Sequence, residues 1–218
     1  MITELSANVA ALKSASKTAR VAFTCLLFLA TASCSRSVPA VRDGDIIFQT
    51  SRSSQSAAVQ RATHSQYSHM GIIFLRGQKP YVLEASATVR YTPLDTWIAR
   101  GQSGAFVVKR LHTPLTPSQV ERMRLATQAF VGRPYDLTFE WSDSRIYCSE
   151  LVWKLYDRAL GIQVGRLQKL RDFDLSDSAV RAKMTERYGD TVPLDSTVIS
   201  PSAIFDSPEL EVVAQDRP

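Results

Sequence analysis

Short apolar runs separated by turn residues occupy the first half of the chain after residue 42. Runs of this length that are rich in β-branched or aromatic residues are typical of β-strands. They lie at residues 46–48, 69–75, 81–85, 89–91 and 106–111. The turn-forming sequence Arg76-Gly77-Gln78-Lys79-Pro80 joins the second run to the third, so the pattern predicts a β-hairpin there.

Helical periodicity begins after residue 116. Thr116 is a good N-cap, Pro117 suits a first helical turn, and the apolar face that follows ends at 132–134. A second amphipathic helix is predicted from Cys148 to a stop at Gly161. Residues 94–99 predict one or two helical turns, and residues 51–63 a short helix or a loop. The charged stretch 166–190 predicts an exposed excursion, a solvated face or lid without chemistry.

The N-terminus has the pattern of an export signal. Lys13, Lys17 and Arg20 precede the apolar run 21–30, and small residues lead to Cys34. That run is shorter than the roughly 20 apolar residues that a spanning helix needs. Ala32-Ser33-Cys34 resembles a bacterial lipobox, although Thr31 stands where lipoboxes usually have leucine. The sequence therefore predicts a signal peptide over 1–34 with lipidation at Cys34, a simple cleaved signal or uncleaved anchor being the alternative.

Composition narrows the class of protein further. The 218 residues are 44% hydrophobic and 22% charged, which is ordinary for one globular domain. The net charge of +5 is mild, and no basic run is interleaved with aromatic residues. The sequence therefore gives no case for a nucleic-acid partner. With 35–42 as a tether, we expect one domain over 43–213, exported to the cell envelope, facing the periplasm and attached to the membrane through its N-terminus.

Cys148 and His69 are the residues with the clearest chemical potential. A cysteine at a helix N-terminus has the position of a nucleophile, because the helix dipole favours thiolate over thiol. A histidine can accept or donate the proton near neutral pH. Cys148 is the only cysteine after Cys34. A buried, inert cysteine is the plainer interpretation from composition, but the helix start and His69 favour a catalytic one.

Glu84 is the best candidate to orient the histidine. It is the lone carboxylate in an apolar strand, on the predicted hairpin partner of the strand that begins with His69. Strands lie about 4.8 Å apart, so its side chain can reach the imidazole. A slip of one residue would instead point Glu84 to the other face, and a solvent-facing edge carboxylate is the alternative. The backbone N–H of Cys148 is a natural oxyanion donor.

The other two histidines are weaker candidates for a catalytic role. His64 suggests a structural or exposed position with some chance of lining the site, and His112 a surface position. Neither an HExxH motif nor paired cysteines occur, so we expect no metal site and no cofactor.

Four segments, in order, carry a resemblance to a known family. They are Asp43-Gly44-Asp45-Ile46-Ile47-Phe48, Tyr67-Ser68-His69-Met70-Gly71-Ile72, Val82-Leu83-Glu84-Ala85 and Tyr147-Cys148-Ser149-Glu150-Leu151-Val152. Together with the tail 199–213, they resemble the permuted papain-like cysteine hydrolases called YiiX/YebB-like, within the NlpC superfamily. The resemblance covers Arg42 to Val213.

This resemblance implies an α+β, circularly permuted papain-like fold, with a small antiparallel sheet packed against the nucleophile helix. It implies Cys148 as nucleophile, His69 as base and Glu84 as third member. We therefore expect a cysteine-dependent hydrolase of amide bonds that acts through an acyl-enzyme on a peptide or lipid-linked acyl substrate. Two alternatives stay open: a lipid-directed acyltransferase or esterase on the same fold, and a non-catalytic binding module of the envelope.

Overall fold

The computed structural model describes residues 40–216. The predicted signal peptide, Cys34 and most of the tether lie outside these residues. The strands are β1 (Ile46–Gln49), β2 (His69–Arg76), β3 (Lys79–Ala85), β4 (Val89–Pro93), β5 (Phe106–Leu111), β6 (Gln168–Lys169), β7 (Thr197–Val198) and β8 (Leu210–Asp216). The α-helices are α1 (Ser54–Thr63), α2 (Leu94–Arg100), α3 (Pro117–Ala126), α4 (Cys148–Leu160), α5 (Ser178–Tyr188) and α6 (Pro201–Phe205).

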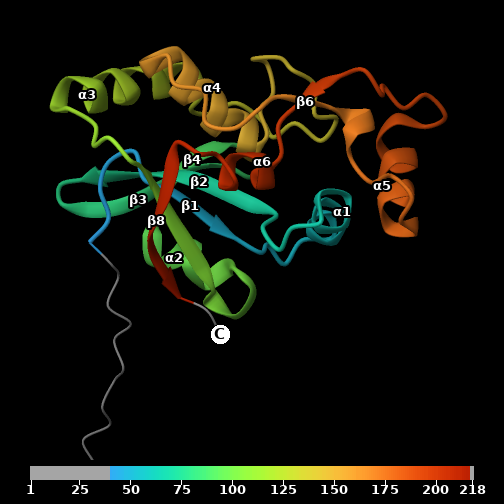
Figure 1. The fold of residues 1–218 in the computed structure, drawn as a ribbon, viewed down its shortest axis with the longest axis horizontal. Helices are drawn as coiled ribbons and strands as arrows, with labels where there is room; N and C mark the ends of the chain where they lie inside the picture. Colours follow the sequence, from blue (N-terminus) through green and yellow to red (C-terminus); the bar gives the residue numbers. More distant parts are fainter. Residues whose placement is uncertain (1–39, 217–218) are drawn as a thin grey trace, which may run out of the picture. The chain divides into compact units, whose positions relative to one another are not determined.

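An antiparallel sheet forms the centre of the domain, in the order β4-β3-β2-β1-β5-β8 (Figure 1). The predicted hairpin is confirmed as β2 and β3, with Ile72 opposite Leu83. The strand β8 was not expected from the sequence, and it pairs with β5 across a bulge at Val108 and Lys109. The small pair β6–β7 lies apart from this sheet.

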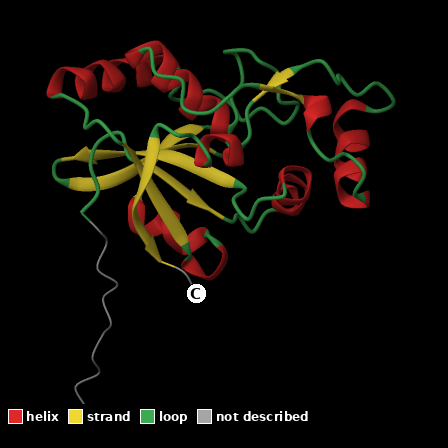
Figure 2. Cartoon of the chain, viewed as in Figure 1, coloured by secondary structure: helices red, strands yellow, loops and turns green. Residues whose placement is uncertain are grey.

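Helices cover both faces of the sheet, with α3 and α4 on one side and α2 on the other (Figures 1 and 2). Alternation along β1 and β2 sends Ile46 and Ile72 toward α4, and Ile47 and Ile73 toward α2. Each face therefore has its own apolar cluster. Burial on both faces explains why these strands read as continuous apolar runs rather than as alternating ones.

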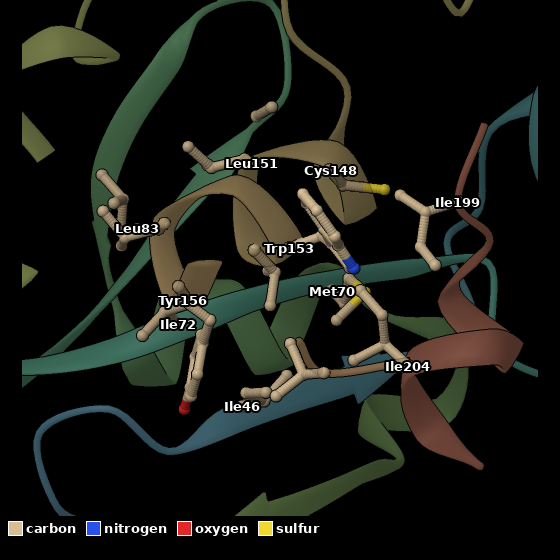
Figure 3. Close-up of a cluster of buried hydrophobic side chains, with 14 of the residues drawn as sticks. Ile46, Met70, Ile72, Leu83, Cys148, Leu151, Trp153, Tyr156, Ile199 and Ile204 are labelled. Carbon is tan, nitrogen blue, oxygen red and sulfur yellow. The ribbon is translucent and has the colours of Figure 1, made fainter. Parts of the chain in front are cut away.

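The helix α4 has the inward face that the sequence predicts. Leu151, Val152 and Leu155 are completely buried. Figure 3 shows Leu151 in the cluster between the helix and the sheet. Gly161 ends the helix with φ = 69°, a left-handed conformation that glycine adopts without steric cost. On the other side of the helix, Lys154 donates to the Ser142 carbonyl at 2.7 Å and to Asp143 at 2.9 Å. These bonds fix the loop that leads into the start of α4.

The interpretation of 166–190 as an exposed excursion without chemistry is incomplete. The side chains of Arg166, Lys169 and Arg171 are exposed as expected. The segment also contains α5, whose Val180 and Met184 are buried in a third apolar cluster with Leu170 and with Ala58 of α1. Val180 and Met184 are four residues apart and therefore share one helical face.

No helix within residues 40–216 has the length and apolar character that crossing a membrane requires.

Packing of α4 against the sheet should contribute measurably to stability. Leu151 is 0% exposed, whereas Leu125 on α3 is 55% exposed. Leu151→Ala is expected to lower the free energy of unfolding by about 2–5 kcal/mol, because it leaves a cavity in the core. The matched control Leu125→Ala should stay within about 0.5 kcal/mol of the wild type. Urea denaturation measures both, and equal losses would contradict the described packing.

Candidate active site

The first residue of β2 and the first residue of α4 meet at one end of the sheet. His69 begins β2, Cys148 begins α4, and the helix packs on that strand. Cys148 is 5% exposed, and its sulfur points toward Ile199, another member of the apolar cluster between α4 and the sheet (Figure 3). The structure thus brings together two residues that lie far apart in the sequence.

Glu84 reaches the histidine from the neighbouring strand. Its Oε2 atom lies 2.7 Å from Nε2 of His69. The pairing of Ile72 with Leu83 places Glu84 on the sheet face that also carries His69. This contact leaves Nδ1 of the imidazole for a second partner. The indole of Trp97 stacks against the same ring, with centroids 5.7 Å apart, and limits its rotation.

Several further donors surround the Glu84 carboxylate, which is 0% exposed. Thr92 donates its hydroxyl to Oε1 at 2.6 Å, and the Trp97 indole donates to Oε2 at 3.1 Å. Arg100 also donates to Oε1, and Arg90 lies 3.9 Å away. The alternative of a solvent-facing edge carboxylate is therefore wrong. The sequence analysis did not identify Thr92, Trp97 or Arg100.

The charges of this cluster are set by burial and by opposite partners. Burial alone would raise the pKa of Glu84, but the hydrogen bond and charge of His69, the Thr92 hydroxyl and the Arg100 charge lower it to about 2. Because its ordinary pKa is 4.5, Glu84 contributes stability above that pH, and the contribution is lost as the pH falls toward 2.

Burial and the neighbouring groups also shift the pKa of the His69 imidazole in opposite directions. Burial would lower the pKa of His69, but side-chain hydrogen bonds to Cys148 and Glu84, with the charges of both, raise it to about 9. His69 is therefore an imidazolium at neutral pH and can donate a proton. A side-chain hydrogen bond to Cys148 is among the causes of this rise in pKa, and Cys148 is the second partner of the ring.

Tyr135 is a residue of the site that the sequence patterns did not reveal. It lies in the irregular segment between α3 and α4, where a bridge to Ile146 holds it close to the start of α4. Its hydroxyl accepts a hydrogen bond from Gln55 at 3.0 Å. Burial and the neighbouring Cys148 both raise the pKa of Tyr135, so its hydroxyl keeps its proton. No periodicity or motif could have selected this tyrosine.

The other two histidines lie elsewhere. His64 caps the end of α1 in a left-handed conformation, is 74% exposed and lies 3.3 Å from Asp174. The surface position expected for His112 is confirmed, because its side chain is exposed and contacts the Pro208 carbonyl.

The comparisons with known proteins show the family of this chain. Residues 40–214 match a family described as permuted papain-like amidase enzymes, the YaeF/YiiX or C92 family. The chain belongs to this family of permuted papain-like amidases. It is accordingly a papain-like cysteine peptidase or amidase, and the α+β fold expected from the sequence is confirmed.

Two relatives come from Escherichia coli. The chain is 52% identical to the uncharacterized protein YiiX of strain K12 over 186 residues, which are 84% of this chain and 92% of that protein. A crystal structure of the metalloprotein yiiX from Escherichia coli O157:H7 is similar with a TM-score of 0.80 and 53% identity, covering 81% of this chain and 98% of that one.

The protonation of His69 can be tested by NMR on histidine-labelled protein. In the wild type, the His69 ring should lose its proton near pH 9. Glu84→Gln is expected to lower this pKa, because the neutral amide no longer stabilises the imidazolium. Glu121→Gln, at an exposed glutamate on α3, is the control and should leave the titration unchanged. An unaltered His69 titration in folded Glu84→Gln would show that the carboxylate does not set the imidazole charge.

Proposed function

We propose that this protein hydrolyses amide bonds with Cys148 as nucleophile, His69 as general acid and base, and Glu84 as the group that orients His69. The observation that carries the proposal is the 2.7 Å contact between His69 and a fully buried Glu84, beside the Cys148 thiol. A nucleophile, a base and an orienting group in this order form the arrangement that acyl transfer requires.

The reaction would proceed in two balanced steps. The Cys148 thiolate attacks the carbonyl carbon, the C–N bond breaks, and the His69 imidazolium gives its proton to the departing nitrogen. An amine leaves, and a thioester remains on Cys148. Neutral His69 then takes a proton from water as the water attacks the thioester, and the sulfur departs as thiolate with release of a carboxylic acid.

Two donors support stabilisation of the oxyanion in both steps. The backbone N–H of Cys148 lies in the first turn of α4, where amides have no partner within the helix and the helix dipole favours negative charge. The Tyr135 hydroxyl accepts from Gln55, so its own proton remains available to a substrate oxygen.

The description of one relative as a metalloprotein requires a test against these residues. Within residues 40–216, no group of three or more histidine, cysteine, aspartate or glutamate side chains could hold a metal ion. Nε2 of His69 faces Glu84, and both oxygens of Glu84 accept from other donors. The described residues therefore do not fit a resident metal.

We place the enzyme in the cell envelope on the pattern of its N-terminus alone. The basic residues, the apolar run 21–30 and the small residues before Cys34 support export and lipidation. A membrane anchor there would hold the domain near substrates of the wall or membrane surface.

The catalytic roles predict the kinetics of two variants. With p-nitroanilides of aliphatic acids and short peptides as substrates, Cys148→Ala should abolish hydrolysis while circular dichroism shows an intact fold. Tyr135→Phe should lower kcat by roughly 10²–10³, the usual effect of losing one oxyanion donor. Mass spectrometry should find the acyl group on Cys148 in the wild type only. Full activity in Cys148→Ala would disprove the nucleophile assignment.

The envelope location is tested separately, in a bacterial host. Full-length protein grown with labelled palmitate should incorporate label, and Cys34→Ser should not. Cys25→Ser is the matched control, because Cys25 lies inside the segment that export would remove. Unlabelled wild-type protein in the cytoplasmic fraction would count against export.

A further inference from the structure

A hollow of about 360 Å³ lies beside His69, and most of the residues that line it are polar. It is bounded by the end of β1, the connection to α1, the start of β2 and the end of β3. Arg52 and Arg100 belong to this lining, whereas none of the described carboxylates does. The surface of the hollow therefore offers hydrogen-bond donors and positive charge.

Arg52 carries the charge of this hollow that is not yet engaged. It lies between β1 and α1, its side chain is exposed, and within residues 40–216 it has no hydrogen-bond or ion-pair partner. Arg100, in contrast, already donates to the buried carboxylate of Glu84. The guanidinium of Arg52 is therefore available to a bound anion, with which it can form charge-assisted hydrogen bonds.

Two other side chains of the lining contain buried atoms without partners. Gln49 is 3% exposed, and its amide forms no hydrogen bond within residues 40–216. Its oxygen lies against Gly101, where a Cβ would be 2.2 Å away, so the amide nitrogen is the end left facing the hollow. The Oγ atom of Ser86 is also buried and unpartnered in the described structure. Both groups can donate, so acceptor oxygens of a ligand would supply the partners that buried polar groups normally have.

The N-terminus of α1 has the same preference. Ser53 caps this helix by accepting from the amide of Ser56 at 3.2 Å, and Ser53 and Gln55 both line the hollow. The other amides of the first turn have no partner within the helix, and no acidic residue lies in that turn. Free amides and the positive end of the helix dipole favour a negative group.

The mechanism determines which part of a substrate enters this hollow. After the C–N bond breaks, the acyl group stays on the Cys148 sulfur. The departing nitrogen receives its proton from His69, so the amine leaves on the side of the histidine, where the hollow lies. This assignment rests on the proposed function, because it needs the roles given to both residues.

We propose that the hollow beside His69 is the leaving-group subsite and that it binds an anionic group of the amine, either a carboxylate or a phosphate. Arg52 binds the anion through its charge, and Gln49 and Ser86 donate further hydrogen bonds. The substrate is then an amide whose amine carries an acidic group. An amine with a second positive charge is disfavoured, because Arg52 and the His69 imidazolium repel it.

The subsite can be tested with amides that share one acyl group, chosen as the one whose p-nitroanilide is hydrolysed fastest. The four amines are glycine, 2-aminoethyl phosphate, glycinamide and ethylenediamine. All four amides release the same acid, which liquid chromatography quantifies, and kcat/KM is taken after subtracting the rate with Cys148→Ala. The readout is the ratio of each kcat/KM to that of the glycinamide compound, compared between variants so that intrinsic reactivities cancel.

In the wild type, the glycine or the phosphate compound should exceed the glycinamide compound by roughly tenfold or more, the usual effect of one charge-assisted hydrogen bond. The faster of the two identifies the anion. The ethylenediamine compound should be the slowest. Arg52→Gln should bring the anionic ratio close to one, and Arg52→Lys should keep part of it because the charge remains. Arg42→Gln is the matched control, since this exposed arginine precedes β1 as Arg52 follows it, and it should keep the wild-type ratio.

The outcomes separate this proposal from the proposed function. Hydrolysis that depends on Cys148 but does not distinguish the anionic amides from glycinamide overturns the anionic subsite and leaves the nucleophile standing. An anionic preference that Arg52→Gln retains in full, or that Arg42→Gln loses equally, also overturns the assignment of the hollow. Hydrolysis that Cys148→Ala retains, or a failure of every amide and p-nitroanilide to react, overturns the proposed function and the subsite with it.

Discussion

The buried carboxylate of Glu84 is the constraint on which the site depends. An unpaired charge in this position would be very costly, because the interior solvates it poorly. Thr92, Trp97 and Arg100 supply donors from β4 and α2, and His69 supplies the remaining contact. The strands β3 and β4 and the helix α2 must therefore be in place before the imidazole can be held. The orientation of His69 follows from the hydrogen bonds that the buried Glu84 carboxylate requires.

Because the site depends on contacts in the folded structure, the order of His69 and Cys148 along the chain matters little for bringing them together. The histidine precedes the cysteine by 79 positions, yet β2 and α4 begin at the same end of the sheet. Strand β2 lies inside the sheet, where two neighbours fix its register, and α4 packs directly on it. Any connection that lets α4 lie on this face would bring the same two side chains together.

The sequence predicted the parts of the site that have a local pattern. His69 and Cys148 each begin an element, and a strand start and a helix start can be recognised from neighbouring residues. Glu84 was harder, because Val82, Leu83 and Ala85 are all buried and give no alternation from which to read its face. Tyr135 was missed because the irregular segment that carries it has no period. The strand β8 was missed because Glu211, Val212 and Val213 are exposed at the sheet edge, without the apolar pattern of a buried strand.

The helices α1 and α5 form an apolar wall beside Cys148. Its apolar residues make a small cluster distinct from the two clusters that cover the sheet. Substitutions at Val180 or Met184 would reshape the cavity beside Cys148 without touching the donors around Glu84, since these lie at the opposite edge of the site. The charged exterior of α5 hid this packing in the sequence, because the inward face of the helix amounts to a few residues at four-residue spacing.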